Sequence, residues 1–272
     1  MIRFKSFSSG SCGNCYLLSL EEAGKVQAGV LIDAGVSLRR LKKELAADGL
    51  STEDFDNILV THDHMDHIRN LGSLCKYLHK PVWASKELLY ALSHNTFTLD
   101  HIGAVKRELK DKDWNEIVPG TLSVRYFTVP HDATQTVGYA IRLNGYNFVI
   151  MTDLGRMTEE ALEFASKAQT VVIESNYDMD MLMGGPYPHE LKMRICQGSG
   201  HLSNDECADA VREFWHEGLR HIFLCHLSEH NNTPRKATAC TAEVLKGLGA
   251  DTQTTLVALP RQTPSQYYIL EQ

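Results

Sequence analysis

Three absences narrow the classes of protein to which this 272-residue sequence can belong. It contains no apolar run long enough to span a membrane, and its first residues lack the apolar core of a signal peptide. Basic residues are outnumbered, with 27 Lys and Arg against 34 Asp and Glu, for a net charge of −7. This balance argues against a surface coated in basic charge for nonspecific nucleic-acid binding, although it leaves room for a local basic groove.

A disulfide framework is also missing. The seven cysteines are odd in number and scattered, which predicts a reducing compartment. We therefore expect a cytoplasmic protein that does not bind a membrane. Cys12 and Cys15 have metal-ligand spacing, but no second such pair exists, so we do not expect a structural zinc site there. The chain is 43% hydrophobic and has no linker or low-complexity segment, which predicts one domain over residues 1–272.

The residues richest in chemistry are 61–67, Thr-His-Asp-His-Met-Asp-His, directly after the strand-like apolar residues 58–60. So many imidazoles and carboxylates are costly to bury without partners, and a divalent metal ion would bind them. In an extended chain His62 and His64 point the same way and can reach one ion. Asp66 and His67 are adjacent and diverge, which suits a second ion. The alternative is a polar loop with surface histidines, and the density of ligands favours the metal.

Other predicted strands end in the same kind of residue. Apolar runs finish at acidic or imidazole side chains in six places: Asp33, His62, His131, Asp153, Glu174 and His226. Strand ends that meet along one edge of a sheet would bring these side chains together. The pattern therefore predicts a single site at a sheet edge.

The His-x-His-x-Asp-His motif after a strand resembles the signature of the metallo-β-lactamase-fold superfamily. This resemblance implies an α/β protein, an αβ/βα four-layer sandwich of two mixed β-sheets flanked by helices, with two metals at one edge. It assigns His62, His64 and His131 to the first metal, Asp66, His67 and His226 to the second, and Asp153 as the bridge. Asp33 would orient the metal loop, or alternatively cap the helix predicted over residues 37–45.

Two divalent ions in such a site would activate a water molecule as a hydroxide nucleophile near neutral pH. Zinc suits the imidazole-rich ligand set best, and manganese or iron also remains open.

The second half of the chain resembles tRNase Z-type phosphodiesterases in two short elements, Ile-Glu-Ser-Asn at residues 173–176 and Gly-His-Leu-Ser at 200–203. The resemblance implies that His201, held by Glu174, protonates the leaving oxygen, because a carboxylate beside an imidazole raises the imidazole pKa. The alternative for His201 is a surface residue just before a helix. The sequence departs from tRNase Z in Leu202-Ser203 and in having no identifiable tRNA-gripping arm.

Nearly the whole chain resembles the YycJ/WalJ (VicX) family, through Ser-Gly-Ser-x-Gly-Asn at 9–14, residues 61–67, Glu-Ser-Asn-Tyr-Asp at 174–178, Gly-His-Leu-Ser-Asn at 200–204 and His-Leu-Ser-x-x-Asn-Asn at 226–232. The resemblance implies a cytoplasmic DNA-processing hydrolase, proposed to be an exonuclease, with Asp66, Glu174 and His201 as catalytic residues. Asp153 and His226 are too close in sequence to enclose the β-CASP domain of the similar RNase J group.

The substrate contacts predicted from the sequence are Ser11 and Asn14 in a Gly/Ser-rich loop, which suits a phosphate or is simply a tight hairpin. Lys192 and Arg194, with Arg235 and Lys236, would form a local basic strip for phosphates. We expect DNA rather than RNA as substrate. The alternatives are an RNA-processing nuclease, a thioester or lactone hydrolase of the same fold, and a regulator with a vestigial site. The sequence carries no signal for the oligomeric state.

Overall fold

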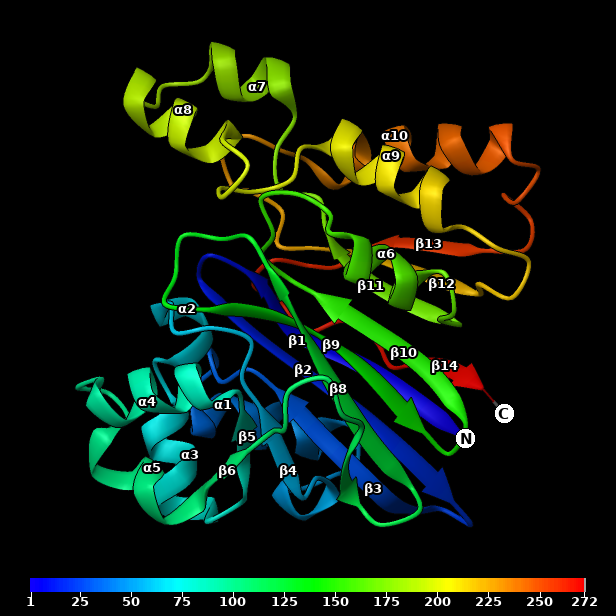
Figure 1. The fold of residues 1–272 in the computed structure, drawn as a ribbon. Helices are drawn as coiled ribbons and strands as arrows, with labels where there is room; N and C mark the ends of the chain where they lie inside the picture. The colour runs from blue at the N-terminus through cyan, green and yellow to red at the C-terminus, as the bar shows by residue number, and fades with distance from the viewer. Residues whose placement is uncertain (272) are drawn as a thin grey trace.

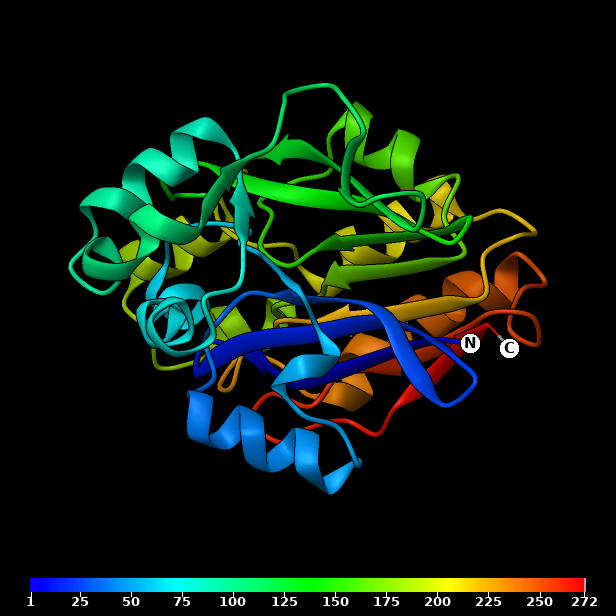
Figure 2. The ribbon, with the colours of Figure 1, turned by 90° about the horizontal axis from the view of Figure 1, so that it is seen from below.

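Two seven-stranded β-sheets face each other in the computed structural model of the protein, which describes residues 1–271. Helices lie on the outer side of the paired sheets, as the two views in Figures 1 and 2 show. This arrangement confirms the four-layer α/β sandwich of two mixed sheets expected from the sequence. The last strand pairs with the first, so the two ends of the chain lie close together (Figure 1).

The first sheet has the order β14-β1-β2-β3-β4-β5-β6. Its strands are β1 (Ile2–Gly10), β2 (Gly13–Glu22), β3 (Lys25–Ile32), β4 (Asn57–Leu59), β5 (Val82–Ala84), β6 (Lys106–Glu108) and β14 (Tyr268–Glu271). The strands from β14 to β3 are antiparallel, whereas β3 to β6 are parallel.

The second sheet has the order β13-β12-β11-β10-β9-β8-β7. Its strands are β7 (Asn115–Val118), β8 (Leu122–Val129), β9 (Thr136–Leu143), β10 (Tyr146–Met151), β11 (Thr170–Glu174), β12 (His221–Cys225) and β13 (Thr255–Ala258). Strands β10 to β13 are parallel. Parallel strands covered on both faces read as continuous apolar runs, which is why residues 171–173 and 222–225 lack alternation.

The helices are α1 (Leu38–Ala47), α2 (Met65–Ile68), α3 (Leu71–Leu78), α4 (Lys86–His94), α5 (Leu99–Val105), α6 (Glu159–Ala165), α7 (Met179–Gly184), α8 (His189–Cys196), α9 (Asn204–Phe214) and α10 (Pro234–Gly247). Local sequence sets several helix starts. Ser203 and Glu206 form a capping box at α9, and Pro234 is the first residue of α10. Among residues 1–271, no helix is both long enough and apolar enough to cross a membrane.

Aromatic side chains join the two sheets. The ring of Phe4 on β1 lies 5.3 Å from that of Phe148 on β10 and 4.9 Å from that of Phe223 on β12, measured between centroids. Two further apolar clusters fill the spaces between each sheet and its helices. Packing in these clusters thus fixes the positions of the strand ends. The candidate site is built on those strand ends.

Two segments with little periodicity in their sequence still contain regular elements. Residues 95–120 contain α5, β6 and β7, whose polar edge positions obscure their periodicity. Residues 177–187 contain α7. Together α7 and α8 stand away from the sandwich (Figure 1), and we call residues 177–200 the overhang.

Candidate metal centre

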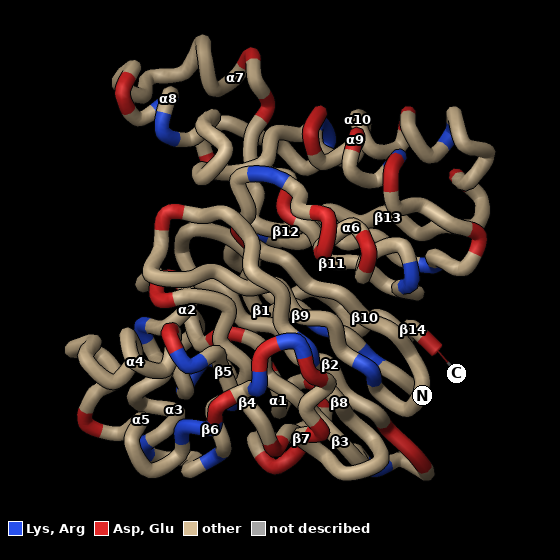
Figure 3. Tube along the Cα trace, in the orientation of Figure 1, with Lys and Arg blue, Asp and Glu red and all other residues tan. Residues whose placement is uncertain are grey.

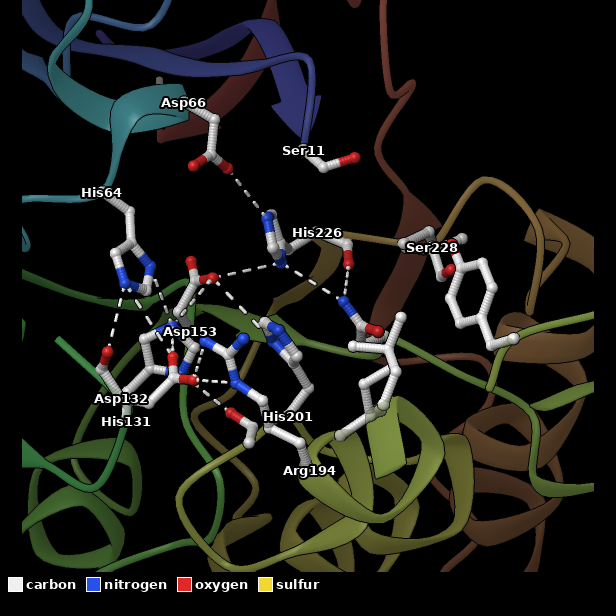
Figure 4. A pocket seen from close by; sticks show the side chains of 16 residues that line it. Ser11, His64, Asp66, His131, Asp132, Asp153, Arg194, His201, His226 and Ser228 are labelled. Carbon is white, nitrogen blue, oxygen red and sulfur yellow. Dashed lines mark hydrogen bonds and ion pairs between the residues drawn. The ribbon is translucent and has the colours of Figure 1, made fainter. Parts of the chain in front are cut away.

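The strand-end residues predicted as metal ligands gather at one edge of the sandwich. Loops after β4, β8, β10 and β12 carry His62, His131, Asp153 and His226, and α2 adds Asp66 and His67. Each of two sets, His62-His64-His131 and Asp66-His67-His226, offers ligand atoms that all lie within 4.8 Å of one another. The side chains of His64, Asp66 and Asp153 converge on the same space in Figure 4.

In the first set, hydrogen bonds select the nitrogen that each imidazole presents. His131 donates from Nδ1 to the Gly200 carbonyl at 2.8 Å, which leaves its Nε2 for the site. His64 donates from Nε2 to the Asp132 carbonyl at 3.2 Å, so its Nδ1 faces His131 Nε2 at 3.3 Å. The Nε2 of buried His62 has no hydrogen-bond partner within residues 1–271.

In the second set, the ligand atoms again face inward. His67 donates from Nδ1 to Asp33 Oδ2 at 2.7 Å, which leaves its Nε2 at 3.5 Å from Asp66 Oδ2. His226 Nε2 lies 3.4 Å from the same Asp66 oxygen. Two imidazoles and one carboxylate therefore surround a second space beside the first.

Asp153 lies between the two sets. Its Oδ2 is 3.2 Å from His67 Nε2, and its Oδ1 is 3.8 Å from His131 Nε2. Asp153 is 2% exposed, and its Oδ2 has no hydrogen-bond partner with acceptable geometry in the described part of the chain. A carboxylate in this position has one oxygen for each set, as a bridging ligand requires.

These residues fit two divalent metal ions. A buried imidazole nitrogen and a buried carboxylate oxygen without partners are costly, and a bound cation would remove both costs. Burial lowers the pKa of His62 well below its usual range, so its lone pair is free. Burial alone would raise the pKa of Asp153, but His226 and His67 hold it well below the usual range, so the carboxylate is ionised. Nitrogen and carboxylate donors suit zinc, manganese or iron.

Asp33 supports the metal loop rather than a helix. Its Oδ1 accepts the Thr61 N–H at 2.8 Å and its Oδ2 accepts the Thr61 hydroxyl at 2.9 Å, in addition to His67. Asp33 has φ +62°, and the N-cap of α1 is Ser37. Two residues on, Gly35 lies so close to the loop that an added Cβ would be 1.9 Å from the Asp66 carbonyl oxygen. The Asp-x-Gly sequence thus serves close packing under the site.

Glu174 and His201 form the pair expected from the sequence. His201 donates from Nδ1 to Glu174 Oε1 at 2.7 Å. Burial alone would lower the pKa of His201, but the Glu174 carboxylate raises it above its usual value. Glu174 has a further contact that the sequence did not reveal, because its Oε1 also accepts from His226 Nδ1 at 3.0 Å. Its Oε2 accepts the N–H groups of Leu154 and Leu202, so the buried carboxylate is fixed on both sides.

A cavity of about 320 Å³ opens beside the candidate ligands. Its polar lining includes His64, Asp66, His131, Asp153, His201 and His226 (Figure 4). Apolar side chains also line it: those of Tyr187, Leu191, Ile195 and Leu227. The sequence gave no signal that these apolar residues line the same cavity as the metal ligands.

The four predicted substrate residues lie in different environments. Ser11 and Arg194 line the cavity. Asn14 is buried, and its amide donates to Asp66 Oδ2 at 3.0 Å and lies 2.8 Å from His67 Nε2, so it supports the ligands instead. Lys192 donates to the Met183 and Gly185 carbonyls, at 2.7 Å each, within the overhang.

The basic strip expected from the sequence is not continuous. Arg194 Nε donates to Asp132 Oδ2 at 2.6 Å, and Lys236 is paired with Asp178 at 3.0 Å. Figure 3 shows acidic and basic residues interspersed in these segments. Asp132 was not predicted as a functional residue, although its place next to His131 was a signal that could have identified it.

Comparisons with known proteins agree with this geometry. Residues 29–226 match the Beta-lactamase superfamily domain. The chain is 32% identical over 257 residues to Exodeoxyribonuclease YycJ of Bacillus anthracis, covering 91% of each chain. It is 30% identical over 230 residues to Exodeoxyribonuclease WalJ of Streptococcus pneumoniae, covering 85% of this chain and 83% of that protein.

Solved structures with low sequence identity share the fold. The metallo-β-lactamase fold protein YhfI from Bacillus subtilis has a TM-score of 0.67 at 15% identity, covering 97% of this chain and 98% of that chain. The short form of human tRNase Z has a TM-score of 0.61 at 14% identity, covering 98% of this chain and all (100%) of the other. The resemblance inferred from the ligand motif is therefore confirmed. The chain belongs to the metallo-β-lactamase superfamily of metal-dependent hydrolases.

Proposed function

We propose that this protein is a phosphodiesterase that removes nucleotides from an end of a DNA strand. The observation that carries the proposal is the Glu174–His201 pair, in which a buried carboxylate holds His201 Nδ1 at 2.7 Å beside the candidate metal ligands. Cleavage of a phosphodiester releases an alkoxide that needs a proton, whereas hydrolysis of a thioester releases a thiolate that does not. The names of the relatives at 30–32% identity support the same substrate class.

The proposed centre holds two divalent ions, zinc in preference to manganese or iron. His62, His64 and His131 would hold one ion, Asp66, His67 and His226 the other, and Asp153 both. When bound, the two ions supply an acidified water as nucleophile and positive charge that stabilises the phosphate.

The roles of the protein residues follow from their contacts. Glu174 occupies Nδ1 of His201, so the ring gives its proton from Nε2 to the leaving oxygen. Because Glu174 also holds His226, one carboxylate positions the proton donor relative to a metal ligand. We also assign Asp66 to the catalytic residues, because it lines the cavity and its Oδ2 lies 3.4 Å from Nε2 of His226.

Arg194 and Ser11 are the proposed phosphate contacts. Arg194 is the one Lys or Arg among the described residues that line the cavity. A phosphate would replace Asp132 as its partner, which makes electrostatic binding local and compatible with the net charge of −7. Lys192 and Asn14 act indirectly. Lys192 stabilises the overhang, and Asn14 positions Asp66. We assign these roles to one domain over residues 1–272, without a β-CASP insertion, acting in the cytoplasm.

The test is a cleavage assay on the purified, metal-analysed protein. End-labelled single- and double-stranded DNA and RNA are incubated with zinc or manganese, with His64→Ala as the control variant. We expect DNA to shorten from one end and the variant to be inactive. Failure to cleave DNA with two metal ions bound per chain would overturn the proposal and favour a small ester or thioester as substrate. Preferential cleavage of RNA would reassign the substrate.

A further inference from the structure

The overhang carries apolar side chains that its own packing does not explain. It is held by two buried apolar residues, Tyr177 and Leu182, and by polar contacts: the Asp178 N–H donates to the Asn231 carbonyl at 2.8 Å, and Lys192 links the α7–α8 connection internally. Its other large apolar side chains include four exposed ones, Met179, Met183, Leu191 and Met193. Apolar side chains that are exposed and border the cavity are available to contact a ligand.

Those apolar side chains face the cavity. Leu191 and Ile195 are one helical turn apart on α8, and Tyr187 lies just before that helix. Leu191 is 37% exposed and lines the same cavity as the imidazoles and carboxylates. The Tyr187 ring is set edge-on to the His230 ring at a centroid distance of 6.1 Å, which limits its freedom.

The two kinds of lining residue together define the ligand. The metal ligands, when they hold divalent ions, would attract an anionic group, and the apolar residues suit a flat or apolar group within the same cavity of about 320 Å³. This volume is at the small end of ligand sites, which start at roughly 300 Å³. A single nucleotide has both groups, a phosphate and a base, at the separation of a sugar. Bases stack on aromatic side chains without regard to sequence.

We propose that Tyr187, supported by Leu191, binds the base of the terminal nucleotide while its phosphodiester lies at the metal centre. The inference rests on the proposed function and adds the residue that selects the substrate. The overhang would then have the role of contacting one base. One nucleotide would be bound in each catalytic cycle.

The experiment combines enzyme variants with two substrates. The first substrate is an ordinary single-stranded DNA, and the second is the same strand with both terminal nucleotides lacking their bases. KM and kcat for the first cleavage are measured for the wild type, Tyr187→Ala and Tyr187→Phe. The matched control is Tyr90→Ala, at an exposed tyrosine on α4 that does not line the cavity.

We expect Tyr187→Ala to raise KM for ordinary DNA about tenfold, the value of one lost base–aromatic contact, with little change in kcat. The wild type should lose a similar factor on the abasic strand, and Tyr187→Ala should lose nothing further there. Tyr187→Phe keeps the ring and should behave as the wild type, as should Tyr90→Ala.

Three results would overturn the inference. Equal KM values of the wild type for ordinary and abasic strands would show that the base is not contacted. This result does not depend on whether Tyr187→Ala folds. An equal loss for Tyr187→Ala on both strands would mean that Tyr187 acts on the centre and not on the base. Failure of the wild type to cleave either strand would instead remove the proposed function, and the inference with it.

Discussion

Replacement of His201 by alanine separates proton donation from the rest of the chemistry. His201 is in neither of the two sets assigned to the ions, and its Nδ1 is bonded to Glu174 at 2.7 Å, although it also forms a possible metal-binding group with Asp153, Glu174 and His226. The variant should therefore retain the metal ions of the wild type. General acid catalysis contributes typically 10² to 10⁴-fold to a rate, so we expect the rate of DNA cleavage to fall by about that factor.

The assay compares two leaving groups. DNA releases a sugar alkoxide, which needs a proton, whereas a nitrophenyl ester of thymidine 5′-phosphate releases a phenolate that does not. We expect His201→Ala to lose about 10² to 10⁴-fold on DNA and less than about tenfold on the nitrophenyl ester. Metal analysis of the same preparation controls for loss of the ions.

An equal loss on both substrates would refute the reasoning, because it would show that His201 supports the centre or binds substrate and does not donate a proton. Full activity of His201→Ala on DNA would also refute the role of His201 as proton donor. A Glu174→Gln variant gives a different pattern, since Glu174 holds both His201 and His226. It should reduce cleavage of both substrates.

Three further predictions follow from the contacts around the centre. Asp33→Ala removes the acceptor of His67 and of the Thr61 N–H, and should weaken zinc binding about 10- to 100-fold in a chelator competition; unchanged affinity would contradict the role of Asp33. Gly35→Ala places a Cβ 1.9 Å from the Asp66 carbonyl oxygen and should lower the free energy of unfolding by more than about 2 kcal/mol in urea titrations, whereas Gly103→Ala, where an added Cβ would meet no described atom within 4 Å apart from its chain neighbours and its own helix backbone, should not lower it. Arg194→Ala should raise KM for DNA with metal content unchanged, whereas Arg235→Ala, outside the cavity lining, should not; equal effects would contradict a specific phosphate contact.

Local patterns in the sequence predicted the layout of the centre. Each ligand follows an apolar strand or lies in the 61–67 motif, and strand ends of a sandwich meet at one edge. The Glu174–His201 pair was also predicted, because both residues lie in short recognisable elements. The position of each of these side chains is set by the few residues on either side of it in the sequence.

Other features depend on contacts between distant segments, which no local pattern encodes. Asn14 was expected to contact substrate, but its amide bonds to Asp66, a residue 52 positions away. Lys192 was expected to contact phosphate, yet its ammonium group is bound to carbonyls of the overhang. The pairing of Arg194 with Asp132 and the apolar face of the cavity likewise emerge when the overhang is placed over the strand ends.

The proposed function requires two metal ions in this cluster for the cleavage of DNA, and one titration tests that requirement most directly. Zinc is added in steps to metal-free protein, and the rate of shortening of end-labelled DNA is measured at each step. We predict a rate that rises up to two equivalents of zinc per chain and then stays constant, with no activity in Asp153→Ala at any ratio. Full activity at one equivalent, or no DNA cleavage at two, would contradict the account.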